Sequence, residues 1–188
     1  ERLKNEYPDA DCTLDYDDAW KLLVSVRLAA QCTDARVNQV TQVLFKKANS
    51  PQKMLQLGES EIAEIIKPCG FFNTKSHNIF TLSKILLEKH NGKVPQTFDE
   101  LEQLPGVGHK TASVVMSHIF KIPAFPVDTH IHRLAKRWGL SNGESVEKTE
   151  SDLKRIFPKE NWEKLHLQII YLRCYRLCVS MNMKSSNA

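Results

Sequence analysis

The chain has 188 residues, with 26 Lys and Arg against 22 Asp and Glu, a formal net charge of +4 and a pI near 8.8. This mildly basic balance is compatible with a polyanionic partner, but many proteins that never bind nucleic acid share it. No apolar stretch approaches membrane-spanning length and no segment has the pattern of a secretory signal, so we expect an intracellular protein that does not contact membranes.

A chain of this length can bury a core as one domain or as two small lobes. Five cysteines are spread along it, an odd number that argues against a disulfide framework and favours reduced thiols. They are Cys12, Cys32, Cys69, Cys174 and Cys178.

Apolar residues recur at helical spacing in the first half of the chain, and no segment shows the strict alternation of a strand. Residues 19–30 form one apolar stripe, and a second follows Thr33, which we expect to cap its helix. Later starts and stops are marked by residues with known preferences for helix ends. We expect helices opened by Ser50 and Pro51, around residues 62–66, and along residues 79–86 with an end at Asn91-Gly92.

The second half continues the helical pattern. Thr97 and Glu100 form a capping box that opens one short helix. Four more helices are predicted at 109–120, 129–138, 146–156 and 161–178, with Gly139 ending the second of them. The sequence therefore predicts an all-α protein of about ten helices, without an internal repeat.

A glycine hairpin, Leu104-Pro-Gly-Val-Gly-His-Lys110, separates two of these helices. Gly106 and Gly108 permit backbone angles that a β-carbon would oppose, so the turn can come close to another molecule. Its amides and the start of the next helix then form an anion site suited to a DNA phosphate. The alternative is an ordinary tight connection between two helices.

Lys110 lies in the first turn of the helix after the hairpin and is a candidate nucleophile. An ordinary lysine has a pKa of about 10.4, so only about one in a thousand is neutral near physiological pH. A helix N-terminus changes this by less than one unit, whereas desolvation can change it by several. A nucleophilic Lys110 therefore requires partial burial. The alternative is a solvated lysine, which the neighbouring hairpin makes less attractive.

Asp128 follows the lysine by eighteen residues, within Val127-Asp-Thr-His130. It can cap the helix that begins there, and taken in isolation capping alone is the simpler interpretation. A carboxylate fixed at a helix start can also stabilise positive charge on a sugar ring or transfer protons. His130 and His132 are two residues apart, which does not favour a metal site on one helix face.

These motifs together resemble the endonuclease III family of DNA glycosylases. The resemblance runs from about Asp15 to Arg173. It rests on four segments, Ala30-Gln-Cys-Thr-Asp34, Gly70-Phe-Phe-Asn73, Leu104-Pro-Gly-Val-Gly-His-Lys-Thr-Ala112 and Val127-Asp-Thr-His130. It implies that Lys110 attacks C1′ of the damaged nucleotide, expels the base and forms a Schiff base that permits β-elimination, with Asp128 as the supporting carboxylate.

The resemblance also implies that the damaged nucleotide is flipped out of the duplex, which costs a few kcal/mol. Gln31 would fill the gap, and Phe71 would be the wedge where a leucine is common in relatives. The hairpin residues Gly106, Val107 and Gly108, together with His130, would contact DNA. The alternatives are a helix-end amide for Gln31 and a core aromatic for Phe71.

Most relatives hold a [4Fe-4S] cluster with four cysteines in a C-terminal loop. This chain has only Cys174 and Cys178 in that region, and neither clearly matches a ligand position. We therefore expect no iron-sulfur cluster, no other metal and no dissociable cofactor, with both thiols packed in a helix.

The family fold implies two helical lobes with an interlobe DNA-binding cleft. One would be a six-helix barrel of residues 14–122 that ends with the helix-hairpin-helix. The other would combine residues 1–13 with 123–188, without the cluster loop. Lys110 and Asp128 would then face each other across the mouth of the cleft.

The favoured hypothesis is a monomeric base-excision repair enzyme, a bifunctional glycosylase and AP lyase for oxidised pyrimidines such as thymine glycol. Its partner would be duplex DNA with a damaged base or an abasic site, in the bacterial cytoplasm or a eukaryotic nucleus. The alternatives are a related glycosylase for mismatched, alkylated or dimerised bases, and a noncatalytic helix-hairpin-helix DNA-binding module, which would not need Lys110, Asp128 and Gln31 together.

Overall fold

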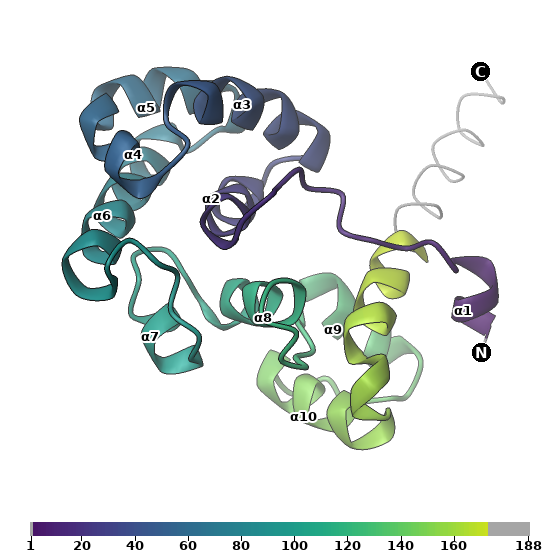
Figure 1. The fold of residues 1–188 in the computed structure, drawn as a ribbon. Coiled ribbons are helices and arrows are strands. Elements are labelled where there is room, and N and C mark those ends of the chain that lie inside the picture. The colour runs from purple at the N-terminus through teal and green to yellow at the C-terminus, as the bar shows by residue number, and fades with distance from the viewer. Residues whose placement is uncertain (1, 173–188) are drawn as a thin grey trace, which may run out of the picture. The chain divides into compact units, whose positions relative to one another are not determined.

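The computed structural model describes residues 2–172, and within this range it contains helices and no strand. The α-helices are α1 (Arg2–Glu6), α2 (Ala19–Ala29), α3 (Asp34–Lys47), α4 (Pro51–Leu57), α5 (Glu59–Ile66), α6 (Phe72–His90), α7 (Phe98–Glu102), α8 (His109–His118), α9 (Thr129–Arg137) and α10 (Val146–Ile156). A further helix begins at residue 162 and is described as far as 172 (Figure 1). The all-α prediction is confirmed, and the end of the predicted helix 161–178 lies outside the described residues.

The starts of several helices are fixed by the side chains that the sequence indicates. The hydroxyls of Thr33, Ser50 and Thr97 each accept an amide hydrogen bond from the first turn, at 3.4, 3.3 and 3.3 Å. In the box that opens α7, the Thr97 hydroxyl also donates to the Glu100 carboxylate at 2.6 Å. These bonds satisfy amides that the helix itself leaves unpaired.

Two helix ends are also where the sequence places them. Asn91 at the end of α6 and Gly139 after α9 both adopt left-handed backbone angles, with φ of 52° and 69°. The next amides turn back, from Gly92 to Leu86 at 2.8 Å and from Leu140 to Ala135 at 2.9 Å. The helix predicted at 109–120 is two residues shorter in the structure, where α8 ends at His118.

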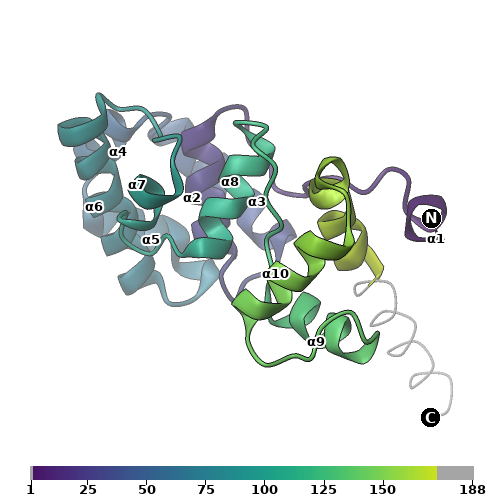
Figure 2. The same ribbon diagram turned by 90° about the horizontal axis from the view of Figure 1, so that it is seen from below.

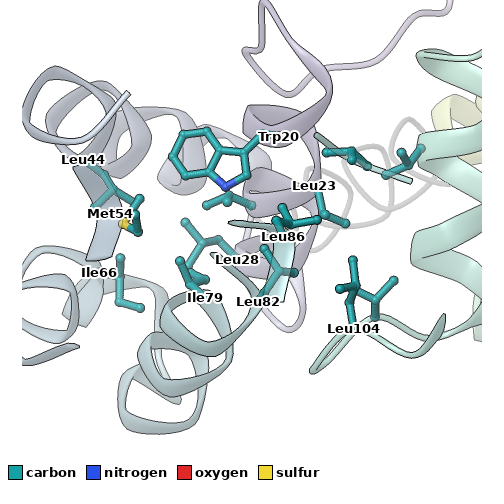
Figure 3. Packing of buried hydrophobic residues seen from close by; sticks show 14 of the residues in the cluster. Trp20, Leu23, Leu28, Leu44, Met54, Ile66, Ile79, Leu82, Leu86 and Leu104 are labelled. Atoms are coloured by element: carbon teal, nitrogen blue, oxygen red, sulfur yellow. The ribbon is translucent and has the colours of Figure 1, made fainter. Parts of the chain in front are cut away.

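The chain divides into two compact units, each with its own hydrophobic core. One unit is Thr13–Lys121 and contains α2 to α8; the other combines Glu1–Cys12 with Ile122–Ala188. In the first unit α4, α5 and α6 pack against one another (Figure 2). Its core gathers Trp20 and Leu28 of α2 with apolar side chains of the later helices, among them Leu44, Met54, Ile66, Ile79 and Leu82 (Figure 3).

The second unit is built around Phe125, Val127, Ile131, Ala135, Leu153 and Ile169. Its two chain segments, far apart in sequence, are joined by hydrogen bonds from the last described helix. The Lys164 ammonium donates to the Ala10 carbonyl at 2.8 Å, and the Gln168 amide donates to the Tyr7 carbonyl at 3.2 Å. The N-terminal residues thus belong to the same unit as residues 122–172.

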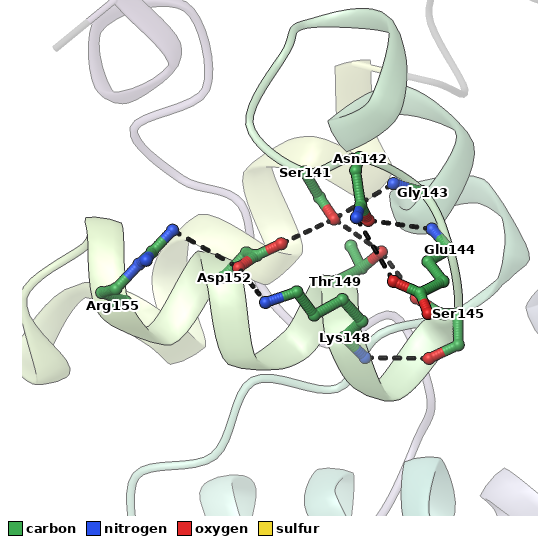
Figure 4. A network of polar contacts seen from close by, with 9 residues as sticks. All are labelled: Ser141, Asn142, Gly143, Glu144, Ser145, Lys148, Thr149, Asp152 and Arg155. Carbon is green, nitrogen blue, oxygen red and sulfur yellow. Dashed lines mark hydrogen bonds and ion pairs between the residues drawn. The ribbon is translucent and has the colours of Figure 1, made fainter.

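A polar network around the buried Asp152 holds α10 to the turn after α9 (Figure 4). Ser141 donates to this carboxylate at 2.9 Å, and Lys148 and Arg155 lie 3.2 and 3.4 Å from it. The Ser141 hydrogen bond, followed by that of Lys148, holds the pKa of Asp152 below its ordinary value. The charge of Asp152 is thereby stabilised in the folded protein.

Candidate functional site

Gly106 in the hairpin between α7 and α8 has a conformation and a location that favour glycine. Its φ is 75°, in the left-handed region. A β-carbon at this position would collide with the Arg27 side chain of α2 and would lie 2.8 Å from Nδ2 of Asn78 on α6. The hairpin is therefore seated directly on α2 and α6.

Gly108 differs from Gly106 in both respects. Its φ of −97° and ψ of 176° are accessible to any residue, and no atom lies within 4 Å of the place where a β-carbon would stand. The expectation that both glycines adopt angles opposed by a β-carbon is thus confirmed for Gly106 and wrong for Gly108. The chain itself does not require glycine there, so a requirement would have to come from a molecule that approaches this surface.

Val107, between the two glycines, points inward. Its side chain is only 5% exposed and belongs to the core of the unit, and its amide donates to the Leu104 carbonyl at 3.1 Å. The expectation that the hairpin amides face outward is therefore wrong for Val107. Its contribution is to anchor the turn in the core.

Lys110 is the second residue of α8, and its N-cap Gly108 supplies no side chain to satisfy the first turn. His109 links α8 to α7, because its ring stacks on Phe98 with centroids 5.3 Å apart and its Nδ1 lies 2.7 Å from a Glu102 oxygen. Lys110 itself is exposed. The chain without DNA therefore does not provide the partial burial that a nucleophilic lysine requires.

Gln31 and Phe71 share an unusual geometry. Both are exposed, and both have positive φ, 57° and 48°, which is rare for residues with a β-carbon. Phe71 is 65% exposed, so the interpretation of this residue as a core aromatic is wrong; its neighbour Phe72 packs against the core instead. Each residue stands at a helix boundary, Gln31 just after α2 and Phe71 as the N-cap of α6.

The sequence analysis did not identify Lys75 on α6 as a functional residue. Its ammonium nevertheless joins the segments that carry Gln31 and Phe71. The side chain is 2% exposed, and Nζ donates to the carbonyls of Leu28, Ala30 and Cys69 at 2.9, 2.8 and 2.9 Å. Burial lowers the pKa of Lys75 from its ordinary value. Helical spacing could have indicated the burial of Lys75, because this residue lies four residues before Ile79, on the apolar face of α6.

These contacts bring the candidate residues of the first unit onto the same two helices. Arg27 meets Gly106 one residue before Leu28, whose carbonyl binds Lys75. On α6, Asn78 lies against Gly106 and stands three residues after Lys75, which is almost one helical turn. The hairpin, Gln31 and Phe71 are thus held by adjoining parts of α2 and α6.

Asp128 is the N-cap of α9, in the second unit. One carboxylate oxygen, Oδ1, accepts the amides of His130 and Ile131, each at 2.9 Å. This confirms the predicted cap and leaves a catalytic role as a prediction. His130 is half-buried, and the His132 ring contacts the Thr149 hydroxyl at 2.8 Å.

The described cysteines do not form a thiolate site. Within residues 2–172 no group of three or more His, Cys, Asp or Glu side chains is arranged to bind a metal ion. Cys69 is buried beside Cys32, and burial raises the pKa of the Cys69 thiol to about 11, which disfavours the thiolate that iron-sulfur clusters require. Cys174 and Cys178 lie outside the described residues, so the absence of a cluster stays a prediction.

The hairpin and the residues around it define a class of protein. The chain belongs to the HhH-GPD superfamily of base excision DNA repair proteins, whose model matches residues 24–159. Among curated relatives it is 42% identical to endonuclease III of Bacillus subtilis (strain 168), over 93% of this chain and 80% of that protein. It is 41% identical to endonuclease III of Escherichia coli (strain K12), over 88% of this chain and 81% of that protein.

A solved structure agrees with these relatives. The trapped covalent intermediate of endonuclease III with DNA, described as an estranged-adenine complex, superposes with a TM-score of 0.87 at 42% identity, over 90% of this chain and 80% of that one. The family expected from the sequence is therefore confirmed. Among the residues that the structure describes, no helix has the length and apolarity that crossing a membrane requires.

Proposed function

We propose that Lys110 and Asp128 carry the reaction of a bifunctional DNA glycosylase and AP lyase that removes oxidised or ring-saturated pyrimidines, such as thymine glycol. Membership of the endonuclease III family makes the chain a base-excision repair enzyme that acts on DNA. Family membership therefore favours an enzyme over a noncatalytic DNA-binding module. Because the substrate is DNA, we expect the enzyme in the bacterial cytoplasm or a eukaryotic nucleus. We also expect it to act as a monomer.

The position of Lys110 is the observation that carries the proposal. The lysine stands in the first turn of α8, directly after the hairpin, where the helix has no side-chain cap. A DNA phosphate bound at this helix start would deliver the sugar of the same strand to the lysine. The trapped covalent intermediate of the related endonuclease III with DNA supports a nucleophile of this kind.

In the proposed reaction the Lys110 amine forms a bond to C1′ while the bond from C1′ to the base breaks, and the base leaves with a proton. Opening of the sugar ring gives an imine, which permits loss of a proton from C2′ and expulsion of the 3′ phosphate. Asp128, fixed by two amides at the start of α9, would stabilise the positive charge and transfer the proton.

The exposure of Lys110 indicates that bound DNA also changes the surroundings of this lysine. Since Lys110 is exposed in the chain without DNA, we expect the bound nucleotide to contribute to the exclusion of water around it.

Borohydride trapping tests the proposal. Incubation with a duplex bearing thymine glycol or an abasic site, followed by borohydride, should give a covalent complex with the wild-type protein. Lys110→Ala should abolish it and retain salt-sensitive DNA binding, whereas the exposed Lys93→Ala should trap normally. Trapping by Lys110→Ala would show that another amine is the nucleophile. Faster excision of mismatched, alkylated or dimerised bases than of thymine glycol would overturn the substrate class.

A further inference from the structure

Lys75 is a buried cation that the proposed chemistry does not use. Its ammonium is bound by three backbone carbonyls, at 2.8 to 2.9 Å, and these come from two separate segments, the end of α2 and the turn before α6. Burying a charge without an ionised partner is costly, and three well-aligned carbonyl dipoles offset part of that cost. A buried ammonium with this cost needs a role beyond filling space.

The bound carbonyls stand next to the two strained residues. The Ala30 carbonyl belongs to the peptide that leads into Gln31, and the Cys69 carbonyl to the peptide that leads into Gly70 and then Phe71. Gln31, Gly70 and Phe71 all have positive φ, at 57°, 67° and 48°. A left-handed residue with a β-carbon costs about 1 to 3 kcal/mol and persists only where its surroundings fix it.

Simple capping of α2 does not account for this arrangement. The last carbonyls of a helix can be satisfied by water or by a polar side chain without a buried charge. Capping also does not explain why the same nitrogen binds Cys69, which lies in a different segment. One ammonium with three donors can fix two loops at once, as a neutral amide with two donors cannot do at three acceptors.

We infer that Lys75 is the positioning residue that sets Gln31 and Phe71 at a fixed separation, so that both can enter the base stack around an extruded nucleotide. This inference rests on the proposed function. Gln31 and Phe71 are exposed and held before DNA arrives, so the duplex meets a rigid pair rather than two loops that must be ordered on binding.

A double-mutant cycle tests this role. Lys75→Met has a similar volume and no donors, and binding to a duplex with a tetrahydrofuran abasic analogue should weaken about tenfold, the size expected for losing a stacking contact. In a Gln31→Gly, Phe71→Ala background the same substitution should change the affinity less than about twofold, because the residues that Lys75 positions are already removed. Lys84→Met, an exposed lysine on the same helix, is the matched control and should change nothing.

A purely structural lysine gives a different result. Equal losses of affinity in the two backgrounds, or no loss in either, would overturn the inference. Circular dichroism should verify that each variant is folded at the temperature of measurement. Where Lys75→Met does not fold, Lys75→Gln, which retains two N–H donors, enters the same cycle.

Amide exchange of the wild-type protein gives a test that needs no variant. The amides of Cys32 and Gly70 donate within these segments, to Ala29 and Lys67 at 3.0 and 3.2 Å, so they report whether the segments open. We expect both to exchange slowly without DNA; exchange at the rate of unstructured peptide would contradict a preformed pair. The borohydride experiment separates this inference from the proposed function. If the proposed function fails, the wild-type protein will form no covalent complex with abasic DNA.

Discussion

The Arg27 side chain fills the space in which a β-carbon of Gly106 would stand, so α2 and the hairpin meet at a position that favours glycine. Burial lowers the pKa of the Arg27 guanidinium, and its Nε has no hydrogen-bond partner among the described residues. The contact is therefore one of close packing rather than of hydrogen bonding at Nε.

Substitution of Gly106 should disturb the fold. Gly106→Ala adds left-handed strain and a clash with Arg27, and we expect it to lower the free energy of unfolding by about 2 to 4 kcal/mol. Urea denaturation measures this loss. A loss smaller than about 0.5 kcal/mol would mean that Arg27 can move aside at little cost.

Gly108 should show the opposite behaviour. Gly108→Ser meets open space and keeps a good N-cap residue, so the free energy of unfolding should stay within about 0.5 kcal/mol of the wild type. Its side chain would nevertheless stand between the turn and a bound phosphate, so the affinity for duplex DNA should fall. Unchanged affinity in a titration at fixed salt would argue against a close approach of DNA to this glycine.

Phe71 should matter to DNA and not to stability. Because the ring is 65% exposed, Phe71→Ala should leave the free energy of unfolding within about 0.5 kcal/mol of the wild type. Its affinity for a lesion duplex should fall about tenfold if the ring stacks on bases. Phe72→Ala is the control with the reverse pattern, since that ring packs against the core.

Two substitutions can distinguish the capping role of Asp128 from the role of its charge. Asp128→Ala should cost about 1 kcal/mol of stability through loss of the two amide bonds, whereas Asp128→Asn keeps an N-cap oxygen and should be nearly as stable as the wild type. If the carboxylate acts in the reaction, Asp128→Asn should still lose base excision. Normal excision by the asparagine variant would reduce Asp128 to a capping residue.

The second unit should lose stability in acid through Asp152. Its pKa in the folded protein lies below the ordinary value of 3.8, chiefly because Ser141 donates to the carboxylate. The stabilisation is therefore present above the unfolded value and is lost as the pH falls through the folded value. The difference in melting temperature between the wild type and Asp152→Asn should shrink as the pH is lowered below 3.8; a constant difference would contradict this origin.

Much of the fold could be predicted because its signals are local. The boundaries of α10 and the caps at Thr33, Ser50 and Asp128 depend on residues within one helical turn. The α1 helix was missed because none of its residues is fully buried and only Leu3 packs against the core, so it produces no apolar stripe.

The site was less predictable, because its decisive features are tertiary. Gly106 and Gly108 are alike in sequence, and they differ only in the fold, by their backbone angles and by the side chains of Arg27 and Asn78 that lie against Gly106. A lysine is expected at the surface, so the burial of Lys75 could not be predicted from residue type, whereas the exposure of Lys110 follows the ordinary preference of its residue type. The carbonyls that bind Lys75 lie up to 47 residues away in the chain.

The phenyl ring of Phe71 remains in water in the free chain, and this has a consequence beyond repair. An exposed apolar side chain that is held outward by its backbone can bind other hydrophobic surfaces, such as a chromatography resin or a partly unfolded protein. Retention on a hydrophobic matrix should therefore decrease when lesion-bearing duplex is added, since the duplex would then shelter the ring.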